Sequence, residues 1–154
     1  MECRKRNIIV CIDGAHAPGQ IDLHLDDLDA DFYAGNFHKW AYATRGCALL
    51  WTNPKHHKIM EPLTTSHLYK GSLHEKFYQQ GTDDQSNFFA LPVALEYHKS
   101  MGFDALYKNA KELLEYARKK LCDEVGCEMY PVPSSMEAPF MKIVKLPKSE
   151  KVPM

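Results

Sequence analysis

The sequence predicts an α/β fold with a partly parallel sheet, and separate stretches of the chain support this class. A continuous apolar, β-branched run at residues 7–12 is typical of a strand that is covered on both faces. Two more strand candidates follow at residues 31–35 and 47–51, with short crossovers between them, which favours layers of helix on sheet. From Phe103 to Val125, apolar residues recur three and four positions apart, which predicts a long amphipathic helix.

The composition excludes several classes of protein. The chain has 154 residues, of which 45% are apolar and 25% charged, and its net charge is -1. These fractions indicate a globular protein rather than a disordered or fibrous one. The charges balance, so no excess of positive charge indicates binding to nucleic acid or to an anionic membrane. No apolar run is long enough for a membrane span or a signal peptide, and the five scattered cysteines are typical of reduced thiols. We therefore expect a soluble, cytoplasmic enzyme or binding domain.

The connections between the strand candidates are short at first and then long. Residues 23–28 predict a short helix with an acidic outer face, between the first and second strands. Residues 53–84 form a long, polar and irregular connection, and such loops in compact domains are usually functional or disordered. Helical spacing resumes at residues 85–101, where Pro92 must either kink the helix or begin its main body.

The last part of the chain predicts a helix followed by a strand. The long helix opens near Asp104 and closes at Gly126, a residue that suits a helix C-terminus. Prolines then break the chain before a final strand candidate at residues 140–146. We place a domain boundary at residue 101, so that residues 1–101 belong to a sheet-containing domain and residues 102–154 begin a small α+β domain.

Asp13 is the first candidate for a functional residue. It ends the first predicted strand, and in open α/β sheets ligands bind beyond the carboxyl ends of the strands. The alternative is that Asp13 and Gly14 simply form a turn, which by itself is the more common use of this dipeptide. His16 follows in a tight polar loop but matches no metal-ligand spacing.

Lys39 is the second candidate, in the loop after the second predicted strand. It lies between His38 and Trp40, with apolar strands on either side, which is unusual for a solvated charge. A desolvated lysine can form Schiff bases with carbonyl compounds. The alternative is a surface lysine whose aliphatic stem covers Trp40.

The third candidate is the segment of residues 81–84, Gly-Thr-Asp-Asp, just before a predicted helix. A hydroxyl group and free backbone amides at a helix start could bind a phosphate. The alternative is an ordinary N-cap, in which Thr82, Asp83 or Asp84 satisfies those amides. A metal site is the least favoured reading of the eight histidines, because those at residues 56–74 show neither a helical pair nor a cysteine partner.

Taken in order, residues 13–19, 31–40, 45–51 and 81–84 resemble the class V aminotransferase family. The most similar branch is the isopenicillin N epimerase-like group, related to cysteine desulfurases and other fold-type I pyridoxal phosphate enzymes. The resemblance is specific over residues 5–100 and weaker to the end of the chain. It implies that this chain is the C-terminal portion of such an enzyme. The chain would then contain a remnant of the mixed sheet of the large domain, followed by a long helix and a small α+β domain.

The resemblance also implies roles for single residues. Lys39 would be the catalytic lysine that holds pyridoxal 5'-phosphate as a Schiff base and shuttles the substrate proton. Asp13 would pair with the pyridine nitrogen, and His16 would hydrogen-bond the side of the ring that carries the 3-oxygen. Asn36 and His38 would contact the phosphate of the cofactor. Thr82 would contact the phosphate of the cofactor in a neighbouring subunit.

The resemblance implies an enzyme that acts on amino acids or sulfur-containing amino-acid derivatives, within a homodimer. Transamination, epimerisation and C–S or C–N lysis are all compatible with it. Members of the family carry a long N-terminal half before the strand that ends at Asp13, and that half supplies other walls of the active site. The alternative function is therefore a catalytically inactive, truncated remnant that acts as a binding or interaction module.

Overall fold

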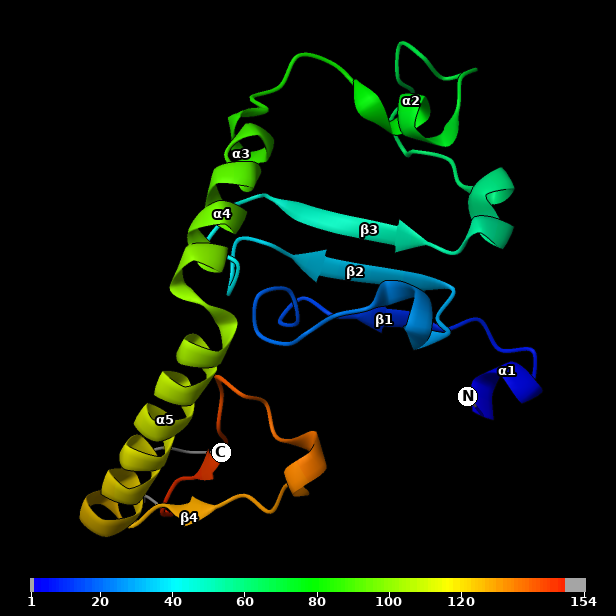
Figure 1. Ribbon diagram of the computed structural model, residues 1–154. Coiled ribbons are helices and arrows are strands. Elements are labelled where there is room, and N and C mark those ends of the chain that lie inside the picture. The colour runs from blue at the N-terminus through cyan, green and yellow to red at the C-terminus, as the bar shows by residue number, and fades with distance from the viewer. Residues whose placement is uncertain (1, 149–154) are drawn as a thin grey trace. The chain divides into compact units, whose positions relative to one another are not determined.

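The computed structural model describes residues 2–148, and the chain divides into two compact units, Met1–Tyr97 and His98–Met154. The first unit contains a three-stranded sheet and the second a two-stranded one (Figure 1). Among the described residues, no helix is both long and apolar enough to cross a membrane.

The sheet of the first unit is mixed. Strands β1 (Cys11–Asp13), β2 (Phe32–Asn36) and β3 (Ala48–Thr52) lie side by side in that order (Figure 1). β1 pairs with β2 in parallel, and β2 pairs with β3 in the antiparallel sense. The strands lie where the apolar runs predict them, but β1 begins later than expected. The short helix α1 (Glu2–Lys5) and a left-handed residue, Asn7, occupy the start of the chain instead.

One face of this sheet is covered and the other is open. On the covered face, Tyr33 is 1% exposed and is flanked in register by Ile12 and Trp51. The opposite face presents small and apolar side chains to solvent, including Cys11 and Leu50, the latter 56% exposed. The prediction that the first strand is covered on both faces is therefore wrong for the described chain. β1 has only three residues, has one neighbouring strand, and is open on the Cys11 side.

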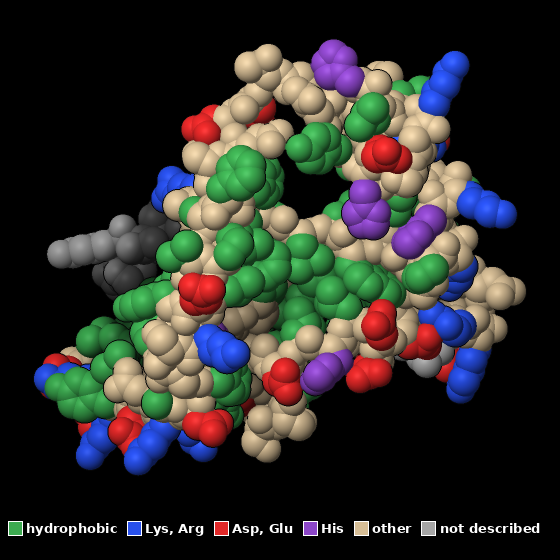
Figure 2. All heavy atoms as spheres, turned by 45° about the horizontal axis from the view of Figure 1, so that its top comes forward, with side chains coloured by type: hydrophobic (Ala, Val, Ile, Leu, Met, Phe, Trp, Pro, Cys, Tyr) green, Lys and Arg blue, Asp and Glu red, His purple; other side chains and the backbone are tan. Residues whose placement is uncertain are grey.

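Hydrophobic side chains also reach the surface elsewhere, as Figure 2 shows by their green colour. The fully covered apolar residues of the first unit are few and small apart from Tyr33: Ala30, Ala41, Ala43 and Cys47. The interior of this unit therefore depends on close backbone packing around a single aromatic ring rather than on a large apolar core.

The carboxylate of Asp31 connects three segments at the amino end of β2. Its Oδ2 accepts a hydrogen bond from the backbone N–H of Val10, 2.8 Å away and just before β1. Its Oδ1 lies 2.8 Å from Nε2 of His56 and forms an ion pair with Lys55, both in the 3-10 helix η2 (Pro54–Ile59). The hydrogen bond from Lys55, then that from Val10, then that from His56 hold the pKa of Asp31 well below its usual range, although desolvation opposes them. The charged carboxylate thereby anchors β1 and η2 to β2.

The segment predicted as irregular contains short helices. Besides η2, it holds α2 (Leu73–Tyr78), which begins with a capping box between Ser72 and Glu75. The acidic segment expected to be a short helix forms the 3-10 helix η1 (Leu25–Leu28).

The helices after residue 85 follow the sequence pattern closely. α3 (Ser86–Phe89) is short, and α4 (Leu91–Met101) starts with Pro92 as its second residue, so the proline begins a helix rather than kinking one. α5 (Phe103–Val125) has the bounds that the apolar spacing predicts. It ends at Gly126, which has a φ of +75° and donates its N–H to the carbonyl of Cys122.

In the second unit, a small antiparallel pair follows α5. β4 (Glu128–Met129) pairs with β5 (Val144–Lys145), and the 3-10 helix η3 (Ser134–Met136) lies between them in sequence. An ion pair of 2.8 Å joins Glu128 to Lys145 across the pair. The final strand is thus shorter than the expected span of residues 140–146.

We expect Asp31→Asn to remove a part of the stability that depends on pH. Because folding lowers the pKa of Asp31, its contribution is complete above about pH 4, the usual value for Asp, and is lost as the pH falls toward the lower folded value. The variant should have a lower free energy of unfolding at neutral pH and should lose less of it on acidification. Urea unfolding at a series of pH values measures both effects.

Asp26→Asn is the matched control for this experiment. It changes an exposed carboxylate of η1 that forms no hydrogen bond or ion pair with residues 2–148. Asp26→Asn should therefore leave the acid dependence unchanged. Equal acid dependence in Asp31→Asn and in the unmodified chain would contradict the role assigned to Asp31.

Candidate functional site

The parallel pairing of β1 and β2 brings two loops to one edge of the sheet. Asp13, the last residue of β1, lies opposite Ala34, and β2 ends two residues later at Asn36. The loop after β1 and the loop after β2 therefore leave the sheet at the same edge, where ligands bind in open α/β folds. Asp13 and Lys39, which lie far apart in the sequence, both belong to this edge.

Tyr33 and Gly14 set the position of the first loop. The Tyr33 hydroxyl donates a hydrogen bond of 3.1 Å to the carbonyl of Gly14, and the Gly14 N–H donates to the carbonyl of Ala34 at 2.8 Å. A Cβ atom at Gly14 would lie 2.2 Å from the Tyr33 ring. Burial, and secondly the negative charge of Asp13, raise the pKa of Tyr33, so its hydroxyl remains a donor. Glycine at this position thus serves close packing as well as the turn.

The two loops lie against each other beyond the sheet. Gly19 has a φ of +81°, and a Cβ atom there would lie 2.6 Å from the backbone at Trp40 and Ala41. The indole N–H of Trp40 donates a hydrogen bond of 3.3 Å to Nδ1 of His16. The contact joins His16, from the first loop, to the residue that follows Lys39 in the second.

Asp13 is exposed at this edge and keeps part of its carboxylate available. Its Oδ1 accepts a hydrogen bond of 3.1 Å from the backbone N–H of Ala15, as a turn-forming aspartate does. Its Oδ2 has no hydrogen-bond partner within residues 2–148. The turn and a ligand-binding role are therefore compatible at this residue, since each uses a different oxygen.

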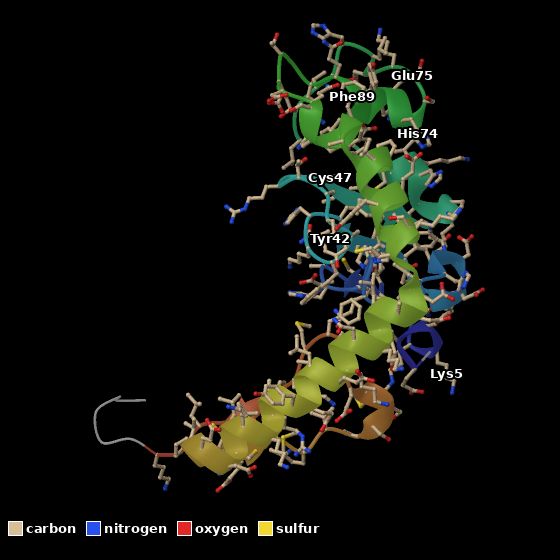
Figure 3. All side chains as sticks on the ribbon, turned by 60° about the vertical axis from the view of Figure 1, so that its left-hand side comes forward. Lys5, Tyr42, Cys47, His74, Glu75 and Phe89 are labelled. Atoms are coloured by element: carbon tan, nitrogen blue, oxygen red, sulfur yellow. The ribbon has the colours of Figure 1, made fainter. Side chains whose placement is uncertain are left out.

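The second loop is closed by its own backbone. The Phe37 N–H donates to the carbonyl of Cys47 at 3.0 Å, and the Ala43 N–H donates to the carbonyl of Phe37 at 3.1 Å. Nδ1 of His38 lies 3.2 Å from the same Cys47 carbonyl oxygen. Figure 3 labels Tyr42 and Cys47 on this loop. Cys47 is 0% exposed, so its thiol does not reach a ligand at the surface, and burial raises the pKa of that thiol.

Three of the predicted site residues are partly buried here: Asn36 at the end of β2, and His38 and Lys39 in the second loop. The ammonium group of Lys39 has no ion-pair or hydrogen-bond partner in the part of the chain that the structure describes. Of the predicted residues, the structure therefore brings Asp13, His16, Asn36, His38 and Lys39 to one edge of the sheet.

Thr82 lies elsewhere, in the irregular segment between α2 and α3, where it is exposed. No hydrogen bond or ion pair joins it to the other predicted residues among those described. At the start of α3, Asp84 Oδ1 accepts a hydrogen bond of 2.9 Å from the Ser86 N–H, and this bond lowers the pKa of Asp84. A carboxylate thus occupies a free amide of the helix start, as in the capping alternative. The assignment of Thr82 to a phosphate stays a prediction.

The histidines of η2 have structural partners. His56 contacts Asp31 and stacks on Phe32 with ring centroids 5.1 Å apart, and Nε2 of His57 lies 3.0 Å from the carbonyl of Thr52. Within residues 2–148, no group of three His, Cys, Asp or Glu side chains could hold a metal ion. In Figure 2 the visible histidines, in purple, are spread over the surface.

Two partners of the site histidines were not found from the sequence: the indole N–H of Trp40 and the backbone carbonyl of Cys47. The sequence showed Trp40 only as a neighbour of Lys39, whose aliphatic stem could cover it. It had no signal for a bond between residues that lie 24 positions apart, and none for a backbone group.

Comparison with known proteins supports the resemblance on which these predictions rest. The model of the family described as aminotransferase class-V matches residues 1–146 of the chain. Isopenicillin N epimerase from Streptomyces clavuligerus is 33% identical over 141 residues, which cover 81% of this chain and 35% of the relative. Hercynylcysteine sulfoxide lyase from Schizosaccharomyces pombe is 34% identical over 109 residues, which cover 65% of this chain and 28% of the relative. The chain spans about a third of the length of these relatives.

Solved structures confirm the fold class. The cysteine desulfurase from Thermococcus onnurineus superposes with a TM-score of 0.73 at 20% identity, over 88% of this chain and 36% of that one. Alanine–glyoxylate aminotransferase from Nostoc sp. gives a TM-score of 0.68 at 17% identity, over 97% of this chain and 41% of that one. The chain thus has part of a fold-type I architecture, with a mixed sheet and helices, as predicted.

We expect Gly14→Ala to destabilise the first unit by about 1–3 kcal/mol, because the added methyl group overlaps the buried Tyr33 ring. The measurement is the free energy of unfolding in urea. In a Tyr33→Val background the ring is gone, so the same substitution at Gly14 should cost much less. An equal cost in both backgrounds would show that the contact between Gly14 and Tyr33 is not the cause.

Proposed function

Since this chain belongs to the aminotransferase class-V family, we propose that it supplies the lysine side of a pyridoxal 5'-phosphate site. The observation that carries the proposal is the parallel pairing of β1 and β2. This pairing delivers a carboxylate, two histidines and a lysine to the same edge of the sheet.

The side chains at this edge have the chemistry that the cofactor needs. Lys39 offers an amine without an anionic partner within residues 2–148, and it would hold the aldehyde carbon. Asp13 offers the Oδ2 oxygen that its turn leaves available, and it would accept a hydrogen bond from the pyridine nitrogen. His16 would donate to the oxygen beside the aldehyde, and Asn36 and His38 would serve the phosphate. The residues present therefore fit the group.

Each of these side chains has a defined task in the proposed reaction. When bound, the cofactor supplies an electron sink for the negative charge that develops on an amino-acid substrate. The carboxylate of Asp13 would favour a proton on the ring nitrogen by its charge, which would keep that sink effective. When it is not bound to the aldehyde carbon, the amine of Lys39 would accept the substrate proton and return it. The atom that receives the proton, the face from which it arrives and the further bond that breaks would separate transamination, epimerisation and C–S or C–N lysis.

We also propose a substrate class and a homodimeric assembly. The substrate class is an amino acid or a sulfur-containing amino-acid derivative, in line with the names of the matched epimerase and sulfoxide lyase. Thr82 is exposed, which suits a contact with the phosphate in a neighbouring subunit of a homodimer.

A second candidate function is a binding module without catalysis, and the exposure of the site favours it. Asp13 and His16 are both open to solvent within the described chain. A pocket that water enters cannot hold reacting groups in a productive geometry or strengthen their electrostatic contacts. The same residues could then retain the cofactor without turning over a substrate.

Borohydride trapping tests the proposal. The purified chain is mixed with pyridoxal 5'-phosphate, reduced, digested and analysed by mass spectrometry for the modified lysine. Labelling should concentrate on Lys39, because it is partly buried and lies in the loop beside the carboxylate and histidines. Lys39→Ala should abolish this labelling, along with the visible absorbance of the bound cofactor.

Lys70→Ala is the matched control, since Lys70 is exposed and has no partner within residues 2–148. It should leave labelling at Lys39 unchanged. Uniform labelling of surface lysines, or labelling that survives Lys39→Ala, would refute the cofactor site. If Lys39 is labelled but no amino acid in a substrate panel changes the absorbance, the binding module is the function.

A further inference from the structure

We infer that two partners outside the predicted site hold its two histidines in opposite tautomers. Trp40 makes His16 a hydrogen-bond donor at Nε2, and the backbone carbonyl of Cys47 makes neutral His38 an acceptor at Nε2. The tautomers follow from the chain's own hydrogen bonds. Their use toward the cofactor rests on the proposed function.

The tautomer of His16 follows from the nature of its partner. An indole N–H can only donate, so Nδ1 of His16, 3.3 Å from Nε1 of Trp40, must carry a lone pair. The hydrogen of the neutral ring is then on Nε2. The two rings are tilted by 51° with centroids 6.4 Å apart, so they meet at their nitrogen atoms rather than by stacking. His16 therefore presents one N–H group to a ligand.

His38 has the opposite kind of partner, one that accepts a hydrogen bond. A carbonyl oxygen can only accept, so Nδ1 of His38, 3.2 Å from the Cys47 oxygen, must carry the hydrogen. The same oxygen accepts the Phe37 N–H at 3.0 Å, and Cys47 is fully buried, so this acceptor has a fixed position. Nε2 of the neutral His38 ring therefore presents a lone pair.

The two histidines thus offer different chemistry to a ligand. His16 suits a ligand oxygen, and in particular an anionic one, because it donates while the ring is neutral. His38 in its neutral form suits a donor group, and it can contact a phosphate oxygen only after its Nε2 takes up a proton. Of the pair, neutral His16 offers a donor to a ligand and neutral His38 offers an acceptor. Trp40 acts through His16, as a positioning residue.

Nitrogen-15 NMR of the histidine rings tests this inference without any cofactor. The two nitrogen shifts and their couplings to ring protons distinguish the two neutral tautomers. We expect the tautomer with hydrogen on Nε2 for His16 and the tautomer with hydrogen on Nδ1 for His38. Single substitutions, His16→Gln and His38→Gln, assign the signals. The same tautomer at both residues in the unmodified chain would overturn the inference, whatever the outcome of borohydride trapping.

Trp40→Phe then tests the cause, since it keeps an aromatic ring but removes the N–H donor. We expect His16 to change to a mixture of tautomers and His38 to keep its own, which makes His38 an internal control. Trp51→Phe alters the other tryptophan of the chain, in β3, and should change neither signal. Unchanged His16 signals in folded Trp40→Phe would overturn the role of Trp40.

A binding measurement links the tautomer to the ligand. If the cofactor site exists, Trp40→Phe should weaken the binding of pyridoxal 5'-phosphate by about threefold, which is the effect of one modest hydrogen bond. Trp51→Phe should leave the affinity unchanged. Equal affinity for Trp40→Phe and the unmodified chain, in spite of a changed tautomer, would show that His16 does not donate to the cofactor. Absence of binding by the unmodified chain would instead count against the proposed function.

Discussion

The packing of the Tyr33 ring against the backbone at Gly14 is the constraint on which the edge of the sheet depends. Tyr33 is the second residue of β2, is almost fully buried, and donates a hydrogen bond from its hydroxyl to the carbonyl of Gly14, the residue after Asp13. Only a glycine fits between that ring and the start of the first loop. Since β1 is just three residues long, its few ladder hydrogen bonds alone hold it weakly, and the Tyr33 contact fixes where Asp13 ends the strand.

Asp13 lies on the open face of the sheet, which bears on the electrostatic role proposed for it. By register it shares that face with Ala34 and Leu50, both of which are exposed. In water, the attraction between a carboxylate and a protonated ring nitrogen is weak, because solvent screens it. The same attraction becomes several times stronger when apolar groups replace the water. In the proposed site, the effect of Asp13 on a ring nitrogen would therefore depend on how well this face is covered, more than on the position of Asp13.

Local patterns predicted the elements well where the pattern is long or repeats. The periodic apolar residues of α5 and its closing Gly126 gave correct bounds because a helix depends on neighbours three and four positions away. The start of β1 was predicted too early, because Ile8 and Ile9 resemble strand residues although both are exposed and unpaired in the sheet. The prediction that both faces of that strand are covered was also wrong. An apolar run shows that a strand would be stabilised by a covering layer, but it does not show that the layer is present.

The sequence by itself determined the family of the chain and the candidate site residues, because each of the motifs around Asp13, Lys39 and Thr82 is a short, specific run of neighbouring residues. Only the tertiary structure decided which of them meet. The bond from Trp40 to His16 spans 24 positions and that from His56 to Asp31 spans 25. The directions in which the two site histidines donate depend on such distant partners and on a backbone carbonyl. A hydrogen bond across the fold depends on distance and angle in space, and these leave no local signal in the order of the residues.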